Sequence, residues 1–206
     1  MIEVVGPGVP VGSDATAGAS GAEGAGEQPW DGVVVAPMRR RHLRGVVDLE
    51  RRTSHRPWSH SLFQGELRMP TTRVYVVARR AHRVVGFAGL MLNPDEGHVT
   101  NVVVEPDERR AGIAARMLLV LTRAAVERGL DALTLEVRMS NRGAQELYRR
   151  FGFAPGGVRP NYYSDLREDA LIMWAHHISG PEGLARLERI EAGLPWALVQ
   201  EVVADG

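Results

Sequence analysis

The chain has 206 residues, 44% of them hydrophobic, and its 25 arginines balance 25 acidic residues to a formal net charge of zero at pH 7. That size and apolar fraction are typical of one folded domain with tails. The balanced charge gives no electrostatic reason to expect a nucleic acid or a membrane as a partner. Cysteine is absent, which excludes disulfides, thiolate metal sites and a cysteine nucleophile. With no long uncharged apolar run and no signal-peptide pattern, we expect a cytoplasmic protein.

The two ends differ in composition from the middle of the chain. Residues 1–29 are rich in glycine, alanine and proline and cannot bury enough surface to offset the entropy of ordering, so we expect a disordered tail there. One folded domain is expected over residues 30–178. Residues 179–206 form a C-terminal extension, in which Leu184, Leu187 and Ile190 recur at helical spacing. We expect this extension to pack on the core; docking of a partner is the alternative.

The folded part begins with a short apolar strand at residues 33–35. From residue 40 to residue 53, apolar side chains recur at near-helical spacing between arginines, which predicts a first helix. Pro57 interrupts this pattern, and Ser59 is placed to cap a second short helix that contains Leu62 and Phe63.

A meander of three strands follows, and then helices and strands alternate. Strands are predicted at residues 73–79, 84–92, 98–105, 132–138 and 170–174, with one more starting at Phe153; helices are predicted at 112–128 and from an N-cap at 140–141 onward; residues 155–165 are expected to form a loop. This order predicts an α/β fold with a central, mixed, twisted sheet of about seven strands and helices on both faces.

Residues 102–117 join a strand to a helix through a loop that could bind an anion. Val102, Val103 and Val104 form the end of an apolar strand, and Pro106 then breaks it. The helix that starts at Gly112 would present free N–H groups and its positive dipole end. Glycine lets a ligand approach the backbone, and Arg109, Arg110 and Arg116 would add attraction for phosphate. The alternative is a plain strand-to-helix turn with solvated arginines.

Several polar side chains could carry chemistry, and each has a structural alternative. Glu136 lies in an apolar strand, so it is either paired, for example with Arg138, or faces a wet cleft where it could act as a general base. Tyr148 lies on the apolar face of the last helix and is either a core residue or a proton donor. Asn141 could be only a helix cap or could also bind a ligand.

Two adjacent tyrosines, Tyr162 and Tyr163, fall in the expected loop and could line a substrate groove or cover the core. The seven histidines show no metal-ligand spacing, so we predict no metal site. The sequence also lacks the G-x-S-x-G motif, a Walker loop and a dinucleotide fingerprint.

The spacing Arg109-x-x-Gly112-x-Ala114 resembles the Q/R-x-x-G-x-G/A signature of the GNAT N-acetyltransferases, which cradles the pyrophosphate of acetyl-CoA in that family. The whole stretch from Val33 to His177 resembles one GNAT subfamily, the RimI-type enzymes that acetylate the N-terminal alanine of a small-subunit ribosomal protein. The pieces that carry the resemblance are Pro57-Trp58-Ser59, Asn101 to Val104, the loop from Arg109 to Ala115, Leu135 to Arg138, Ser140-Asn141, Leu147-Tyr148, Phe151 to Phe153, Asn161 to Tyr163 and Arg167 to Ala170.

The resemblance implies a role for each matching position. Glu136 would be the general base and Tyr148 the general acid. The acetyl-CoA contacts would come from Val102, Val103, Val104, Arg109, Arg110, Ala111, Gly112, Ile113, Ala114, Ala115 and Asn141, and the substrate contacts from Trp58, Asn101, Tyr162 and Tyr163. Two positions depart from the pattern: Ala114 stands where many members have glycine, and Met139, which replaces a small residue, would narrow the cleft.

The implied reaction is direct transfer of the acetyl group to a neutral amine, with no covalent enzyme intermediate and no metal. Acid–base chemistry favours an α-amine, whose pKa is about 7.7–8.0, over lysine at about 10.4. A ribosomal protein N-terminus is therefore the expected partner, and the protein is expected to be a monomer or weak dimer. The alternatives are a GNAT enzyme that acts on a small amine or on lysine, a GNAT-fold module that binds acyl-CoA without turnover, and a structural role in a complex.

Overall fold

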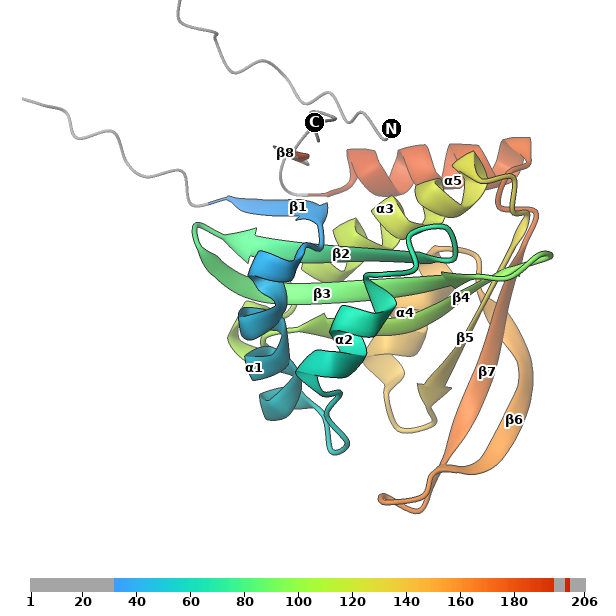
Figure 1. Ribbon diagram of the computed structural model, residues 1–206. Coiled ribbons are helices and arrows are strands. Elements are labelled where there is room, and N and C mark those ends of the chain that lie inside the picture. Colours follow the sequence, from blue (N-terminus) through green and yellow to red (C-terminus); the bar gives the residue numbers. More distant parts are fainter. Residues whose placement is uncertain (1–31, 195–198, 201–206) are drawn as a thin grey trace, which may run out of the picture.

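The computed structural model describes residues 32–194 and 199–200 (Figure 1). The tail expected at residues 1–29 lies outside this described part, as does most of the chain after residue 194. Eight strands form one sheet in the order β6-β7-β5-β4-β3-β2-β1-β8. The strands are β1 Val33–Pro37, β2 Arg73–Arg80, β3 Arg83–Leu92, β4 Gly97–Val104, β5 Ala132–Arg138, β6 Ala154–Tyr163, β7 Glu168–His176 and β8 Val199–Gln200. Neighbours are antiparallel except for the parallel pairs β4–β5 and β1–β8.

Helices cover both faces of this sheet, as predicted (Figure 1). One face, called the front face below, carries α1 Leu43–Thr53 and α2 His60–Glu66; the other, the rear face, carries α3 Ile113–Glu127, α4 Arg142–Arg150 and α5 Pro181–Ala192. Two short 3-10 turns lie at Arg40–His42 and Pro106–Glu108. Among the described residues, no helix is long and apolar enough to cross a membrane.

Each face has its own apolar core. The front core centres on Phe63, whose ring meets Phe87 edge-on at a centroid distance of 5.4 Å. The rear core is larger and packs α3 against the middle of the sheet. Leu187 and Ile190 of α5 join this rear core, and an ion pair between Arg123 and Glu191 ties α5 to α3. Leu184, which we expected on the same buried stripe, is exposed.

The predicted loop at residues 155–165 is wrong, because β6 runs through this segment. β6 is an exposed edge strand paired with β7, and β7 itself starts at Glu168 rather than at residue 170. Proline and glycine gave a loop-like local pattern, but proline is tolerated on an edge strand where its missing N–H is not needed. The ladder register shifts between Pro155 and Gly157 and again between Arg159 and Tyr163, where the strand accommodates these residues.

Both predicted helix caps are present. The Ser59 hydroxyl accepts the N–H of Leu62 at the start of α2. The Asn141 side-chain oxygen accepts the N–H of Ala144 at the start of α4. Such caps satisfy N–H groups that the first helical turn leaves free, and each contributes about 1 kcal/mol.

Candidate active site

The parallel strands β4 and β5 separate along their length. They pair with each other only at Gly97 with Leu133 and at His98 with Thr134. Beyond this point β4 continues to Val104 and β5 to Arg138, but the two strands no longer pair with each other. Backbone groups on the facing edges of these strands are thus left without a ladder partner. Because such groups are strong donors and acceptors, the opening is suited to hold an extended ligand that carries amide groups.

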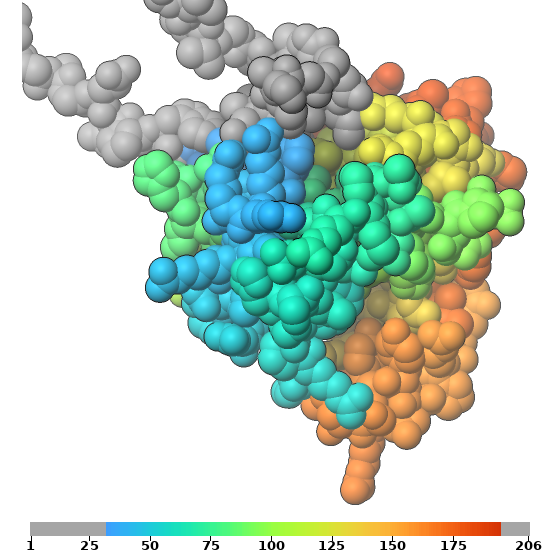
Figure 2. All heavy atoms as spheres, in the orientation of Figure 1, coloured from blue at the N-terminus to red at the C-terminus, as the bar shows by residue number. Residues whose placement is uncertain are grey.

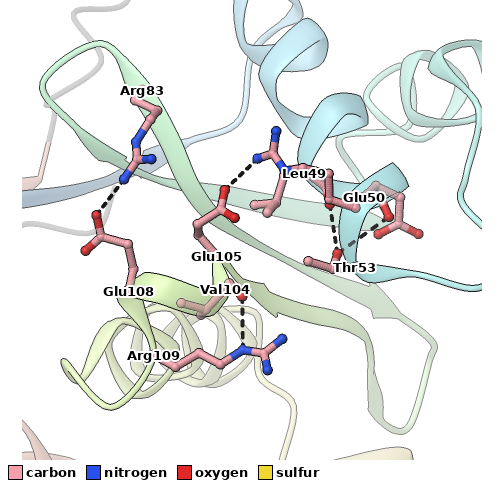
Figure 3. A network of polar contacts seen from close by, with 9 residues as sticks. Leu49, Glu50, Thr53, Arg83, Val104, Glu105, Glu108 and Arg109 are labelled. Carbon is pink, nitrogen blue, oxygen red and sulfur yellow. Dashed lines mark hydrogen bonds and ion pairs between the residues drawn. The ribbon is translucent and has the colours of Figure 1, made fainter.

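The hydrogen-bond alternation of the β3–β4 ladder shows which backbone groups face the opening. The N–H of Glu105 donates to the carbonyl of Val85 at 2.9 Å, so Glu105 and every second residue before it direct their backbone toward β3. Val102 and Val104 therefore direct theirs toward the opening, and Arg109 Nε reaches the Val104 carbonyl at 3.4 Å from that side (Figure 3). The backbone of Val103, the third predicted valine, is directed toward β3, and its side chain packs on the front core.

The loop before α3 has the features of an anion cradle. Gly112 has φ +82° and Arg110 has φ +67°, both in the left-handed region. The first helical hydrogen bond is from the Arg116 N–H to the Gly112 carbonyl. Among the described residues, no acceptor meets the N–H groups of residues 110–115. A run of free donors at a helix N-terminus is a ready site for phosphate.

The side chains around this loop only partly match the prediction. Arg109 and Arg110 are exposed, as an interaction with phosphate requires. Ile113 and Ala115 point into the core, while Ala111 and Ala114 are half-buried. Arg116 is 0% exposed, so the expectation that it adds attraction for phosphate at the surface is wrong. Burial lowers the pKa of its guanidinium to about 10.

Ion pairs anchor the loop at its base (Figure 3). Glu108 accepts hydrogen bonds from Arg80 at 2.8 and 3.1 Å and from Arg83 at 2.8 Å. The hydrogen bond from Arg80 is the main reason that the pKa of Glu108 lies below its usual value. Glu105 pairs with Arg52 of α1 at 2.5 Å. The cradle is therefore fastened to the front helix and to the β2–β3 hairpin.

Glu136 of β5 is paired, but not with the expected residue. Its Oε1 accepts a hydrogen bond from Arg159 Nη1 at 2.9 Å, and its Oε2 lies 3.1 Å from His98 Nε2. Arg138, the partner suggested by the sequence, instead places its guanidinium 5.0 Å from the centre of the Tyr163 ring. The carboxylate is 13% exposed, so it is shielded without being fully buried.

Tyr148 of α4 approaches the same strand from the rear. It belongs to the rear core with Leu135 and Val137, whereas Glu136 alternates with these two residues and faces the front. Burial raises the pKa of Tyr148, with a smaller contribution from Tyr163. No hydrogen-bond partner for its hydroxyl is found within the described residues. The two expected acid–base groups thus lie on opposite faces of β5, beside the opening.

The expected substrate residues surround the front side of this opening. The Trp58 ring lies tilted against Phe63 at a centroid distance of 5.4 Å, and its backbone N–H donates to the Glu50 carboxylate at 3.3 Å. Asn101 follows a bulge in β4, and its buried Oδ1 has no hydrogen-bond partner among the described residues. Tyr162 and Tyr163 lie at the end of β6 with their rings 5.1 Å apart. Burial is the main cause that raises the pKa of Tyr163 to about 12.

The structure adds residues that the sequence analysis missed. His98 and Arg159 hold Glu136, although no motif marked them. Arg56, in the segment between α1 and α2, donates to the Ser164 hydroxyl at 3.1 Å and lies 3.8 Å from Asp165. Figure 2 shows this segment approaching the β6–β7 hairpin on the front of the molecule. Within residues 32–194 and 199–200, no group of three or more histidines and acids could hold a metal ion.

Comparison with known proteins identifies the family. Residues 43–153 match the Acetyltransferase (GNAT) family. The chain belongs to this family. The Escherichia coli K12 ribosomal protein bS18-alanine N-acetyltransferase is 34% identical to this GNAT chain over 146 residues, which are 68% of the chain and 94% of that protein. A Bacillus subtilis protein that carries the same name provisionally is 34% identical over 140 residues, which are 68% of the chain and 93% of that protein.

Solved structures agree with this assignment of the GNAT chain. The crystal structure of the ribosomal-protein-S18-alanine N-acetyltransferase from Escherichia coli has a TM-score of 0.64 at 30% identity and covers 70% of the chain and 94% of that structure. Ard1 from Thermoplasma volcanium has a TM-score of 0.64 at 23% identity, over 70% of the chain and 97% of that structure, and shares the fold. The predicted family, the mixed α/β fold and the acyltransferase class are confirmed.

The donor of the GNAT family is acetyl-CoA, and the features of this chain fit it. Free N–H groups before α3 suit the pyrophosphate, and the exposed backbone edge of β4 suits an amide-bearing arm. The roles expected for individual side chains stay predictions.

Proposed function

We propose that this GNAT enzyme transfers an acetyl group from acetyl-CoA to the N-terminal alanine amine of ribosomal protein bS18. Relatives that carry this activity in their names are 34% identical over nearly their full length. The observation that carries the proposal is the placement of Glu136 and Tyr148 on opposite faces of β5, where β4 and β5 part. A base and an acid on two sides of one opening can serve an amine that enters from one side and a thiol that leaves on the other.

Backbone groups of the chain would bind the donor. The N–H groups of residues 110–115 receive the pyrophosphate, with Arg109 and Arg110 close by, and Asn141 adds a side-chain contact. Val102 and Val104 hold the pantetheine arm through the open edge of β4. One N–H of this edge stabilises the negative charge that develops on the carbonyl oxygen. These donors are held by the strand and the helix before the ligand arrives, which keeps the cost of reorganisation small.

Side chains would carry the acid–base steps. Glu136 takes the proton of the attacking amine through water, and Tyr148 gives its proton to the departing thiolate. Because burial raises the pKa of Tyr148, the phenol remains protonated at neutral pH, as an acid requires. Asn101, Trp58, Tyr162 and Tyr163 lie on the front side and would contact the peptide.

Amine chemistry supports an N-terminal substrate. About a tenth of peptide α-amines are uncharged at neutral pH, compared with a few lysines in about ten thousand. A single carboxylate such as Glu136 can therefore serve an α-amine as the base.

The test is acetyl transfer from acetyl-CoA to three acceptors: a peptide with the N-terminus of bS18, its N-blocked twin that contains lysine, and spermidine. We expect transfer to the free Ala-starting peptide only, and about a 10²- to 10⁴-fold loss of kcat in Glu136→Gln. Arg167→Gln, an exposed change on the neighbouring hairpin, is the control. Preferred transfer to spermidine or to the blocked peptide would overturn the substrate, and a fully active Glu136→Gln would overturn the base.

A further inference from the structure

Arg159 occupies an unusual place beside the expected base. In the β5–β7–β6 ladder, Arg138 lies opposite Ala170, and Ala170 lies opposite Arg159, so the three residues share a row across the sheet. The small, buried Ala170 leaves space between the two arginines. The shift of register that follows Arg159 lets β6 bulge outward, and Asn161 fixes the bulge through an N–H bond of 2.7 Å to Asp169.

From this position, Arg159 reaches across the strands to Glu136. Its Nη1 lies 2.9 Å from Oε1, while the other carboxylate oxygen is 3.1 Å from His98. The Arg159 side chain is 54% exposed and that of Glu136 only 13%, so the guanidinium covers the carboxylate on the solvent side. Its other contact is with the Tyr162 ring, whose centre is 5.1 Å from Cζ.

Other charges nearby have partners of their own. The Arg138 guanidinium lies over Tyr163. Glu168 accepts the Ser140 N–H at 2.7 Å, and hydrogen bonds from the Ser140 side chain and backbone, the side chain first, keep its pKa low. Of these arginines, Arg159 is therefore the one whose ion pair with Glu136 keeps the carboxylate from binding another cation.

This pairing has a consequence for amines that carry a charge. A lysine side chain or a polyamine arrives as an ammonium ion, which binds best to a carboxylate without a cationic partner, and it also needs a strong base to lose its proton. A carboxylate that already holds a guanidinium in an ion pair attracts a second cation much less, because the two positive charges repel each other. An amine that is already partly neutral is affected much less.

We propose that Arg159 is a specificity-determining residue, which restricts acetylation to α-amines by holding Glu136 in an ion pair. The inference rests on the proposed function and names the residue that enforces its substrate class. Glu136 still accepts the proton of a neutral amine, because its carboxylate has lone pairs beyond the two that Arg159 and His98 engage.

The experiment compares Arg159→Gln with Arg159→Lys and with Arg167→Gln. Arg167 is an exposed arginine of the same hairpin with no contact to Glu136, so its replacement removes equal charge nearby. The readout is the ratio of kcat/KM for the Ala-starting peptide to kcat/KM for its N-blocked, lysine-containing twin. We expect Arg159→Gln to lower this ratio about tenfold, mainly through a lower KM for the lysine peptide, which is the scale of one hydrogen bond to a charged group. Arg159→Lys should restore the ratio, and Arg167→Gln should leave it unchanged.

The outcomes separate the inference from the proposed function. An unchanged ratio in Arg159→Gln, with normal activity on the Ala-starting peptide, would overturn the role of Arg159 and leave the function standing. Equal loss of kcat on both peptides would make Arg159 a positioning residue for Glu136 and would also overturn the inference. A wild-type enzyme that does not acetylate the Ala-starting peptide would overturn the function itself. Because Arg159 is largely exposed, thermal unfolding of the variants should match the wild type.

Discussion

The donor side and the acceptor side of the opening are built in different ways. The donor side consists mainly of backbone groups from one continuous stretch, from Val102 on β4 to the first turn of α3. The proposed acceptor side consists of side chains from separate elements: Glu136 of β5, His98 of β4 and Arg159 of β6 meet on the front of the sheet, and Tyr148 of α4 approaches from the rear. A site of backbone groups depends on conformation, whereas a site of side chains depends on the identity of each residue.

This difference predicts opposite sensitivities. Substitutions on the acceptor side should change catalysis with little change in fold stability or in acetyl-CoA affinity. Substitutions on the donor side should act through the shape of the backbone, so that affinity and stability change together.

The largest effect is expected for Tyr148→Phe. Loss of the phenol should lower kcat about 10²- to 10⁴-fold, because the departing thiolate would lose its proton donor. Stability should change little, since the ring stays in the rear core and the hydroxyl has no hydrogen-bond partner among the described residues. Steady-state kinetics and thermal unfolding measure the two quantities, with the exposed Arg167→Gln as the control. A kcat within about twofold of wild type would assign Tyr148 to the core alone.

Gly112→Val tests the donor side. A side chain at φ +82° costs about 1–2 kcal/mol in the folded state, and the backbone shift that relieves this strain should weaken acetyl-CoA binding about tenfold. Calorimetric titration of acetyl-CoA measures the affinity. Gly129→Val is the matched control, because Gly129 ends the same helix with φ +80° and lies away from the cradle. Equal affinity loss in both variants would mean that the strain acts on the whole helix and that the cradle has no special role.

A smaller effect is expected for Asn141, which caps α4 and is proposed to contact acetyl-CoA. Asn141→Ala removes the α4 cap and should lower the free energy of unfolding by about 1 kcal/mol. Asn141→Ser keeps an oxygen that can cap the helix and should restore most of that stability. The GNAT resemblance implies that Asn141 contacts the cofactor, so both variants are expected to bind acetyl-CoA a few-fold more weakly. Wild-type affinity for acetyl-CoA in both variants would mean that Asn141 acts only as a helix cap.

The smallest effect is expected for Glu108→Gln, at the base of the donor loop. The pKa of Glu108 is lowered from 4.5 in the folded protein, so its ion pairs with Arg80 and Arg83 stabilise the fold above about pH 4.5, and this contribution is lost as the pH falls through the lowered pKa. Since Arg83 is largely exposed, we expect a loss of about 1 kcal/mol at pH 7. The free energies of unfolding of the wild type and the variant should converge as the pH falls well below 4.5, and a difference that stays constant down to the acid limit of the fold would contradict the assignment.

The sequence by itself determined the alternation of elements and the donor loop. Strand 97–104, the loop and helix α3 are neighbours along the chain, and turn and cap chemistry acts over a few residues, so local pattern was enough to place them. Ser59 and Asn141 cap their helices for the same reason. The resemblance to GNAT enzymes rests on these same local motifs.

Only the tertiary structure decided the partners of Glu136 and the course of β6. Residues 155–165 look like a loop because proline and glycine dominate them, yet pairing with β7 makes them a strand. That pairing carries Arg159 to Glu136, 23 residues earlier in the chain, and it leaves the adjacent Arg138 on Tyr163. Burial of Arg116 was likewise decided by packing. Contacts between strands that are distant in sequence depend on register, and a shift of one residue turns every side chain to the other face.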